Sequence, residues 1–149
     1  MRFLDQLIVS PLADGIQWAL MADFRYESNI AGLITVPGPK PPEHGGFISD
    51  FTSSPTALQA LIPPWQIYGS AAILHDWLYH DQQTDRETAD AVLREAMTVL
   101  AVDQNTIGRI WTAVRTFGSF AWARNAKLKA SGYTRMASTN STPPYAAAI

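Results

Sequence analysis

The sequence predicts an α+β fold, with short antiparallel strands in the N-terminal half and three helices in the C-terminal half. Before residue 65, the apolar runs are short, rich in β-forming residues and separated by prolines and glycines. Beyond residue 65, apolar residues recur at the spacing of one helical face. A chain of 149 residues fits one domain, and we expect a compact unit over residues 1–130 followed by an extended tail over 131–149.

Three segments of the N-terminal half are predicted to be strands. Residues 16–24 and 31–36 are apolar runs rich in β-formers, and residues 46–51 form a third short run. The segment between the second and third runs contains four prolines and three glycines over residues 37–46. Because these residues do not support regular structure, we expect an extended loop there.

Three helices are predicted in the C-terminal half. The first spans about residues 65–80 and the third about 106–127. The second begins at Thr84, which together with Glu87 has the Thr-x-x-Glu pattern of a capping box. The short link between the first two helices favours a central antiparallel helix hairpin.

Charge is distributed unevenly along the chain. All 13 acidic residues and five of the 11 basic residues lie in residues 1–103, which gives this part a net charge of −8. Residues 104–149 contain six basic residues and no acidic one. Basic and aromatic residues do not alternate as they do in single-strand-binding proteins, so we expect no nucleic-acid partner. We expect the basic part to pair with the acidic part, within the chain or between copies.

Composition excludes several classes of protein. The chain has no cysteine, which excludes a disulfide scaffold, a thiol nucleophile and a zinc site with sulfur ligands. No apolar stretch approaches the roughly 20 residues of a membrane span. Asp5 interrupts any signal-peptide core, so we expect an intracellular protein or a part of a particle assembled in the cytoplasm.

The first predicted helix carries polar residues that suggest chemistry. It is apolar on nearly all sides and should therefore be buried, yet it contains His75 and Asp76. An unpaired buried carboxylate costs several kcal/mol, so Asp76 should face a cation, a metal or a set of hydrogen-bond donors. His75 and Tyr79 are four residues apart and share a helix face, where the tyrosine hydroxyl could fix the histidine tautomer or join its network.

Three further acidic residues could join this centre: Asp50, Asp85 and Asp90. Two carboxylates with backbone carbonyls would suit calcium, whereas one carboxylate holding the histidine would make it a general base for water. Each residue also has an ordinary structural explanation. Asp90 has an arginine four residues away on either side, Asp85 suits the start of a helix, and Asp50 could cap the turn that follows it.

Five segments in order resemble a small family of phage and prophage proteins of unknown function. They include Gly-Phe-Ile-Ser-Asp-Phe at 46–51 and His-Asp-Trp-Leu-Tyr at 75–79. The full set comprises residues 34–37, 46–55, 72–79, 86–90 and 113–118. The resemblance implies a phage source but no activity. We therefore expect a structural or interaction protein of the virion, in the tail or at a connector, whose partners are other phage structural proteins or copies of itself.

The spacing His75-Asp76-x-x-Tyr79 is also similar to the catalytic helix of secreted calcium-dependent phospholipases. This second resemblance implies that His75 activates water, Asp76 binds calcium and Asp90 on the partner helix orients His75, with Tyr79 beside them. Asp50 is a further candidate calcium ligand. The disulfides and the glycine-rich calcium loop of those enzymes have no counterpart here. The alternative function is thus a metal-dependent hydrolase acting on phospholipid or cell-envelope material, in transient contact with the envelope.

Overall fold

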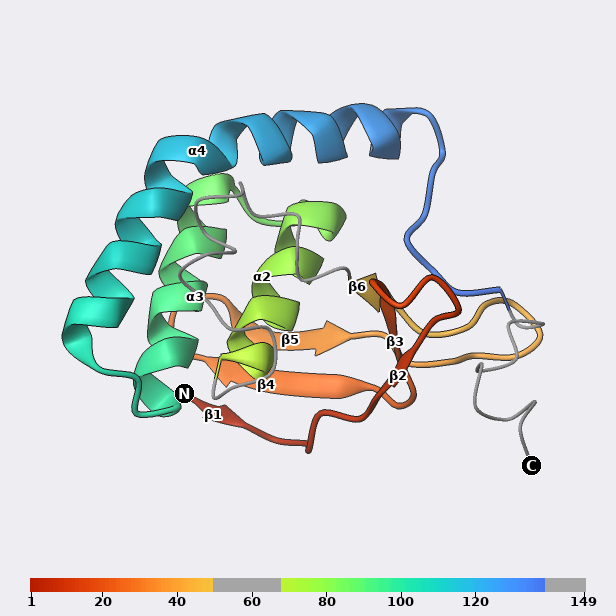
Figure 1. Ribbon diagram of the computed structural model, residues 1–149, viewed down its shortest axis with the longest axis horizontal. Coiled ribbons are helices and arrows are strands. Elements are labelled where there is room, and N and C mark those ends of the chain that lie inside the picture. The colour runs from red at the N-terminus through yellow and green to blue at the C-terminus, as the bar shows by residue number, and fades with distance from the viewer. Residues whose placement is uncertain (50–67, 139–149) are drawn as a thin grey trace.

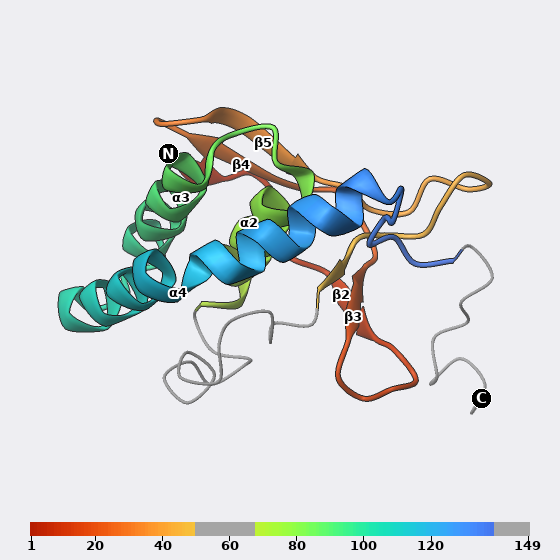
Figure 2. The same ribbon diagram turned by 90° about the horizontal axis from the view of Figure 1, so that it is seen from above.

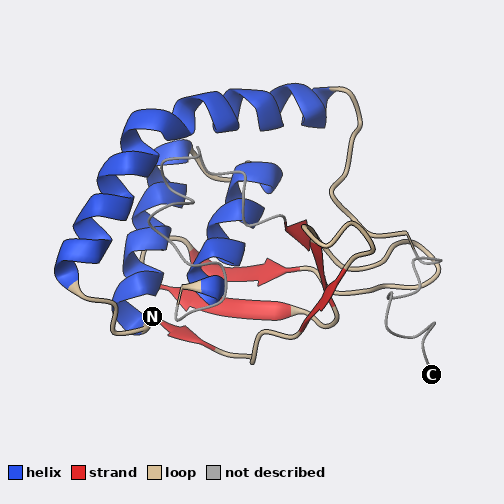
Figure 3. Cartoon of the chain, in the orientation of Figure 1, coloured by secondary structure: helices blue, strands red, loops and turns tan. Residues whose placement is uncertain are grey.

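The computed structural model describes residues 1–49 and 68–138 and has the predicted α+β fold (Figures 1 and 3). Within these residues, two three-stranded antiparallel sheets have the orders β1-β4-β5 and β2-β3-β6. The strands are β1 (Arg2–Phe3), β2 (Val9–Pro11), β3 (Trp18–Leu20), β4 (Phe24–Ser28), β5 (Gly32–Val36) and β6 (Ile48–Ser49).

The described residues also form the helices α2 (Gly69–Asp81), α3 (Arg86–Val99) and α4 (Gln104–Ala130). Helices α2 and α3 form the predicted hairpin; α2 packs against β5 and β6, and α3 packs against β4. The first part of α4 lies beside α3, and its second part crosses over the end of α2 (Figures 1 and 2). None of the helices in the described ranges combines the length and apolar character of a membrane span.

The alternating pattern of β4 attaches the first sheet to the helices. Phe24 and Tyr26 are fully buried, whereas the alternate residues Arg25 and Glu27 are exposed. The hydroxyl of Tyr26 donates a hydrogen bond of 2.9 Å to the carboxylate of Glu95 on α3. The buried face of the sheet is therefore held to α3 by a polar contact as well as by apolar packing.

The strand expected over residues 16–24 is instead two strands in different sheets. β3 ends at Leu20 and β4 begins at Phe24, with a bend between them. At this bend the backbone N–H of Gly38 donates to the Asp23 carboxylate at 2.7 Å. A Cβ on Gly38 would lie 2.3 Å from the carbonyl carbon of Ala22, so the expected proline-rich loop depends on glycine at this contact.

The helix starts differ from the predicted ones by one or two residues. Asp85, rather than Thr84, caps α3, because its carboxylate accepts a hydrogen bond of 2.7 Å from the Thr88 backbone N–H. Asp103 caps α4 in the same way through Thr106, so α4 begins at Gln104. The predicted residues 65–67 of the first helix and 50–51 of the third strand lie outside the described part of the chain.

Residues 133–138, here called the C-terminal strap, return to the compact unit after α4 (Figure 1). The carbonyl of Ala137 accepts from the backbone N–H of Gly45 at 2.7 Å, and its N–H donates to Gly46 at 2.9 Å. The N–H of Ile48 donates to the Arg135 carbonyl at 2.8 Å. The predicted boundary at residue 130 stays a prediction, but the described part of the expected tail is bonded to the segment that leads into β6.

Candidate functional site

Helices α2 and α3 bring His75, Tyr79 and Asp90 together. His75 Nε2 lies 2.8 Å from Asp90 Oδ1, and the Tyr79 hydroxyl donates to the same oxygen at 2.7 Å. The rings of His75 and Tyr79 have centroids 4.2 Å apart, as expected for residues one turn apart on one face. Asp90 is fully buried beneath them. The three residues that the phospholipase resemblance grouped by position are therefore in direct contact.

Two arginines complete the environment of Asp90. Its second oxygen, Oδ2, accepts from Arg86 Nη1 at 3.3 Å and from Arg115 Nη1 at 3.0 Å. Arg86 belongs to α3, like Asp90, whereas Arg115 belongs to α4. Arg94, the other arginine four residues from Asp90, instead lies over the Trp111 ring at 5.6 Å from its centroid. Asp90 is thus a buried junction of three helices rather than a member of a surface pair.

The carboxylate of Asp90 accepts every hydrogen bond that its neighbours make to it. Burial raises the pKa of Asp90, but hydrogen bonds from His75, Tyr79 and Arg115 outweigh it and hold the pKa below its usual range. Burial, followed by the bond to Asp90, raises the pKa of the Tyr79 hydroxyl, which therefore stays protonated and donates. Because an ionised carboxylate only accepts, His75 donates to Asp90 through its Nε2–H, and in the neutral form of the ring Nδ1 then presents a lone pair.

A glycine on α4 makes this arrangement sterically possible. A Cβ on Gly118 would lie 2.3 Å from the Tyr79 hydroxyl oxygen and 3.5 Å from Arg86 Nη1. The absence of a side chain lets α4 approach the tyrosine that binds Asp90. Gly118 and Arg115 were not among the site residues predicted from the sequence. Both lie in segment 113–118, one of the five segments that resemble the phage and prophage family. That resemblance was the sequence feature that could have indicated their role.

Asp76 lies in a second buried cluster, and its hydrogen-bond partners differ from those of Asp90. Arg135 of the C-terminal strap donates to Asp76 Oδ1 at 2.7 Å through Nη1 and to Oδ2 at 3.0 Å through Nη2. Ser49 of β6 donates to Oδ2 at 2.7 Å. The Arg135 guanidinium also lies 5.3 Å from the centroid of the Phe47 ring. The cation that a buried Asp76 was expected to face is therefore the guanidinium of Arg135.

The residues described around Asp76 do not assemble a calcium site. Calcium takes six to eight oxygen ligands, whereas the Asp76 oxygens are engaged by Arg135 and Ser49. Within residues 1–49 and 68–138 no three His, Cys, Asp or Glu side chains are grouped closely enough to hold a metal. Asp50 lies outside these residues. The assignment of Asp76 and Asp50 as calcium ligands stays a prediction.

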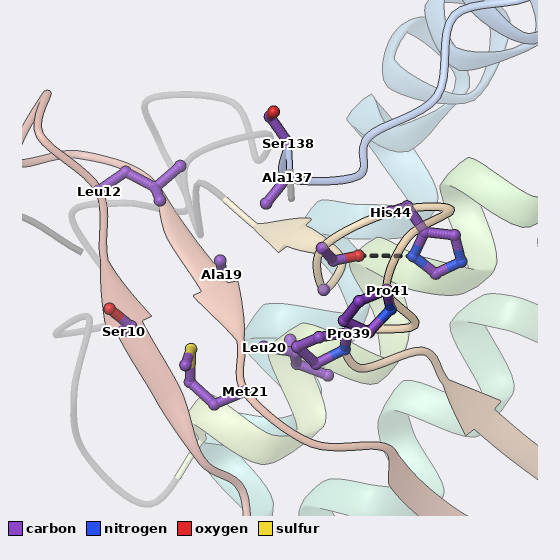
Figure 4. A pocket seen from close by; sticks show the side chains of 12 residues that line it. Ser10, Leu12, Ala19, Leu20, Met21, Pro39, Pro41, His44, Ala137 and Ser138 are labelled. Carbon is purple, nitrogen blue, oxygen red and sulfur yellow. Dashed lines mark hydrogen bonds between the residues drawn. The ribbon is translucent and has the colours of Figure 1, made fainter. Parts of the chain in front are cut away.

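A hollow of about 180 Å³ lies elsewhere on the molecule (Figure 4). It lies between the β2–β3 hairpin, the proline-rich loop and the C-terminal strap. Its lining is mostly apolar and includes Leu12, Leu20, Met21, Pro39, Pro41 and Ala137. None of the predicted site residues in the described part of the chain lines it. This hollow is therefore separate from the His75–Asp90 contact.

The fold and the site define a small α+β protein whose helix hairpin encloses a carboxylate-bound histidine. The chain belongs to the DUF1353 family, proteins of unknown function, whose profile matches residues 18–114. The matched region contains both hairpin helices with His75, Tyr79 and Asp90, whereas Arg115, Gly118 and Arg135 lie beyond it. Comparisons with curated proteins and with solved structures find no match.

Breaking the Asp76–Arg135 pair should destabilise the protein strongly. We expect Arg135→Met to lower the free energy of unfolding by about 3–5 kcal/mol, because it leaves a buried carboxylate unpaired. Adding Asp76→Leu should recover most of that loss. Urea unfolding measures both, with Arg2→Met in the exposed Arg2–Glu27 pair as the control, expected to cost less than about 1 kcal/mol. Equal losses in the single and double variants would contradict this interpretation.

The stabilisation supplied by Asp90 should depend on pH with a defined sign. Its folded-state pKa is lowered, so its contribution is present above the ordinary value of 3.8 and is lost as pH falls through the lowered pKa. The difference in unfolding free energy between the wild type and Asp90→Asn should therefore be greatest near neutral pH and shrink in acid. Glu87→Gln, on the exposed side of α3, should change the unfolding free energy by less than about 0.5 kcal/mol. A pH-independent difference for Asp90→Asn would contradict the assignment.

Proposed function

We propose that the chain is a hydrolase in which His75 activates water against an ester of phospholipid or of other cell-envelope material. The observation that carries the proposal is the 2.8 Å contact between His75 Nε2 and the buried Asp90 carboxylate. A general base needs an orienting partner on one nitrogen and a lone pair on the other. The His75 side chain keeps 13% of its surface exposed. Among the described residues no hydrogen bond involves its Nδ1.

The arrangement supports a two-stage proton transfer at Nδ1. In the first stage the oxygen of water attacks the ester carbonyl carbon while Nδ1 of His75 takes the water proton. In the second stage the bond between carbon and the leaving oxygen breaks, and the same proton passes from Nδ1 to the leaving alcohol. Asp90 stabilises the positively charged ring between these stages. Tyr79, Arg86 and Arg115 keep Asp90 ionised and in position throughout.

In this proposal Asp76 has a positioning role. It follows His75 directly in α2 and is fixed by Arg135 and Ser49, which limits rotation of the helix that carries the base. No step is assigned to a metal, because the described residues around Asp76 do not form a calcium site. Measuring hydrolysis with and without added calcium tests the ligand roles predicted for Asp76 and Asp50.

Hydrolysis of phospholipid vesicles by the purified protein is the direct test. We expect fatty-acid release that falls at least about 100-fold in His75→Gln, because general-base assistance typically contributes that much. His44→Gln, in the loop outside the helix hairpin, is the matched control and should retain activity. Circular dichroism establishes that both variants are folded. Unchanged hydrolysis in a folded His75→Gln variant would exclude the proposed base.

A structural role in a phage virion is the second candidate function. The observation that favours it is that both buried carboxylates of the hairpin, Asp76 and Asp90, are paired with arginines of the same chain. A network that only stabilises the fold requires this pairing and no substrate. Under this proposal the protein copurifies with particles, bound to other structural proteins or to copies of itself. Immunodetection in purified virions checks this, and a monomer absent from particles would contradict it.

A further inference from the structure

Helix α4 has an outward stripe of apolar and basic side chains. Its members are spaced three and four residues apart, which places them within one arc of the helix. They are Phe117, Phe120, Arg124 and Lys127, here called the α4 stripe. The two phenylalanines are 43% and 79% exposed, although most large apolar residues of the hairpin helices are buried. Two exposed aromatic rings one turn apart on a helix are a candidate docking surface.

The charge on this helix has one sign. α4 contains five basic residues and no acidic one over its 27 residues. Arg115 faces inward and pairs with Asp90. Within residues 1–49 and 68–138, however, Arg124 and Lys127 make no ion pair. The stripe therefore presents unneutralised positive charge beside exposed aromatic rings, and its complement is a negatively charged surface with an apolar layer beneath it.

The face of α4 that adjoins the stripe anchors the helix in the fold. Ile107, Ile110 and Val114 are buried in the core, and Gly118 contacts the Tyr79 hydroxyl position. The stripe is thus displayed on a helix whose position is already fixed, and docking requires no unfolding. Gly118 follows Phe117 on the same turn of α4, so the stripe and the Tyr79–Asp90 contact lie on adjoining sides of one part of this helix.

We propose that the α4 stripe binds the protein to an anionic phospholipid surface. Phe117 and Phe120 enter the boundary between headgroups and acyl chains, while Arg124 and Lys127 bind the lipid phosphates. The choice of lipid over an acidic protein surface rests on the proposed function, because a lipid hydrolase must reach its substrate at such a surface. The docked helix would then hold the His75–Asp90 site next to the lipid layer.

Sedimentation with phospholipid vesicles tests this surface separately from catalysis. We expect the wild-type protein to bind phosphatidylcholine vesicles that contain phosphatidylglycerol, and to bind pure phosphatidylcholine more weakly. Arg124→Gln with Lys127→Gln should weaken binding about 25-fold, since each basic residue near an anionic surface contributes about fivefold. Phe117→Ser with Phe120→Ser should abolish detectable sedimentation. The controls are Arg2→Gln and Leu33→Ser, which change an exposed arginine and an exposed leucine of the first sheet and should bind like the wild type.

The outcome separates this proposal from the proposed hydrolase. His75→Gln should bind vesicles as the wild type does. Binding by the wild-type protein without any hydrolysis would support the stripe and refute the enzyme. Wild-type protein that does not sediment with anionic vesicles would overturn the membrane assignment. It would also be overturned if the stripe variants bound normally, or if their only defect were loss of a dimer in ultracentrifugation, which would assign the stripe to a second copy of the chain.

Discussion

The buried carboxylate of Asp90 is the constraint on which the helical half of the structure depends. An ionised carboxylate in the interior is very costly unless charged and polar donors surround it. Here α2 supplies His75 and Tyr79, α3 supplies Arg86 and α4 supplies Arg115. Any packing of the three helices that separated these groups would leave Asp90 unpaired. The requirement selects one arrangement from the many that apolar packing alone would permit.

A second buried carboxylate applies the same requirement to the other side of α2. Consecutive residues on a helix point about 100° apart, so His75 and Asp76 cannot face the same neighbour. His75 faces Asp90 of α3, whereas Asp76 faces Ser49 of β6 and Arg135 of the strap. Helix α2 is therefore fixed in rotation from two directions. That rigidity suits a catalytic histidine, and it equally suits a protein whose task is to hold a shape.

Parts of the site could be predicted because they depend on local periodicity. One helical turn relates His75 to Tyr79, and the short hairpin made Asp90 one of three candidate partners. Spacing left Asp50 and Asp85 open as well, and the phospholipase resemblance singled out Asp90. Arg135 could not be found in this way, because it lies 59 residues from Asp76 in a segment without an apolar pattern. The uneven charge distribution did predict ion pairs between the basic and acidic parts of the chain, but not which residues form them. Arg115 and Arg135, both from the acid-free part, pair with buried carboxylates of the acidic part.

The fold shows the same division between local and distant information. The helices were predictable from their apolar spacing, yet Thr84 and Asp85 are both good caps, and only the geometry decides in favour of Asp85. The short strands β1 and β2 contain two and three residues, too few for an alternating pattern to be visible. Their existence depends on partners in β4 and β3 rather than on their own sequence.

The position of Arg135 near the end of the described chain has a consequence for synthesis. Ribosomes add roughly 5–20 residues per second, so the 59 residues between Asp76 and Arg135 correspond to roughly 3–12 s of elongation. By the time α3 is complete at Val99, the nascent chain contains the strands of both sheets and the helix hairpin, but not the guanidinium that neutralises Asp76. The Asp76–Arg135 ion pair therefore cannot form until the strap has been synthesised. Products that terminate before residue 135 retain an unneutralised interior charge, which marks them for chaperones and proteases.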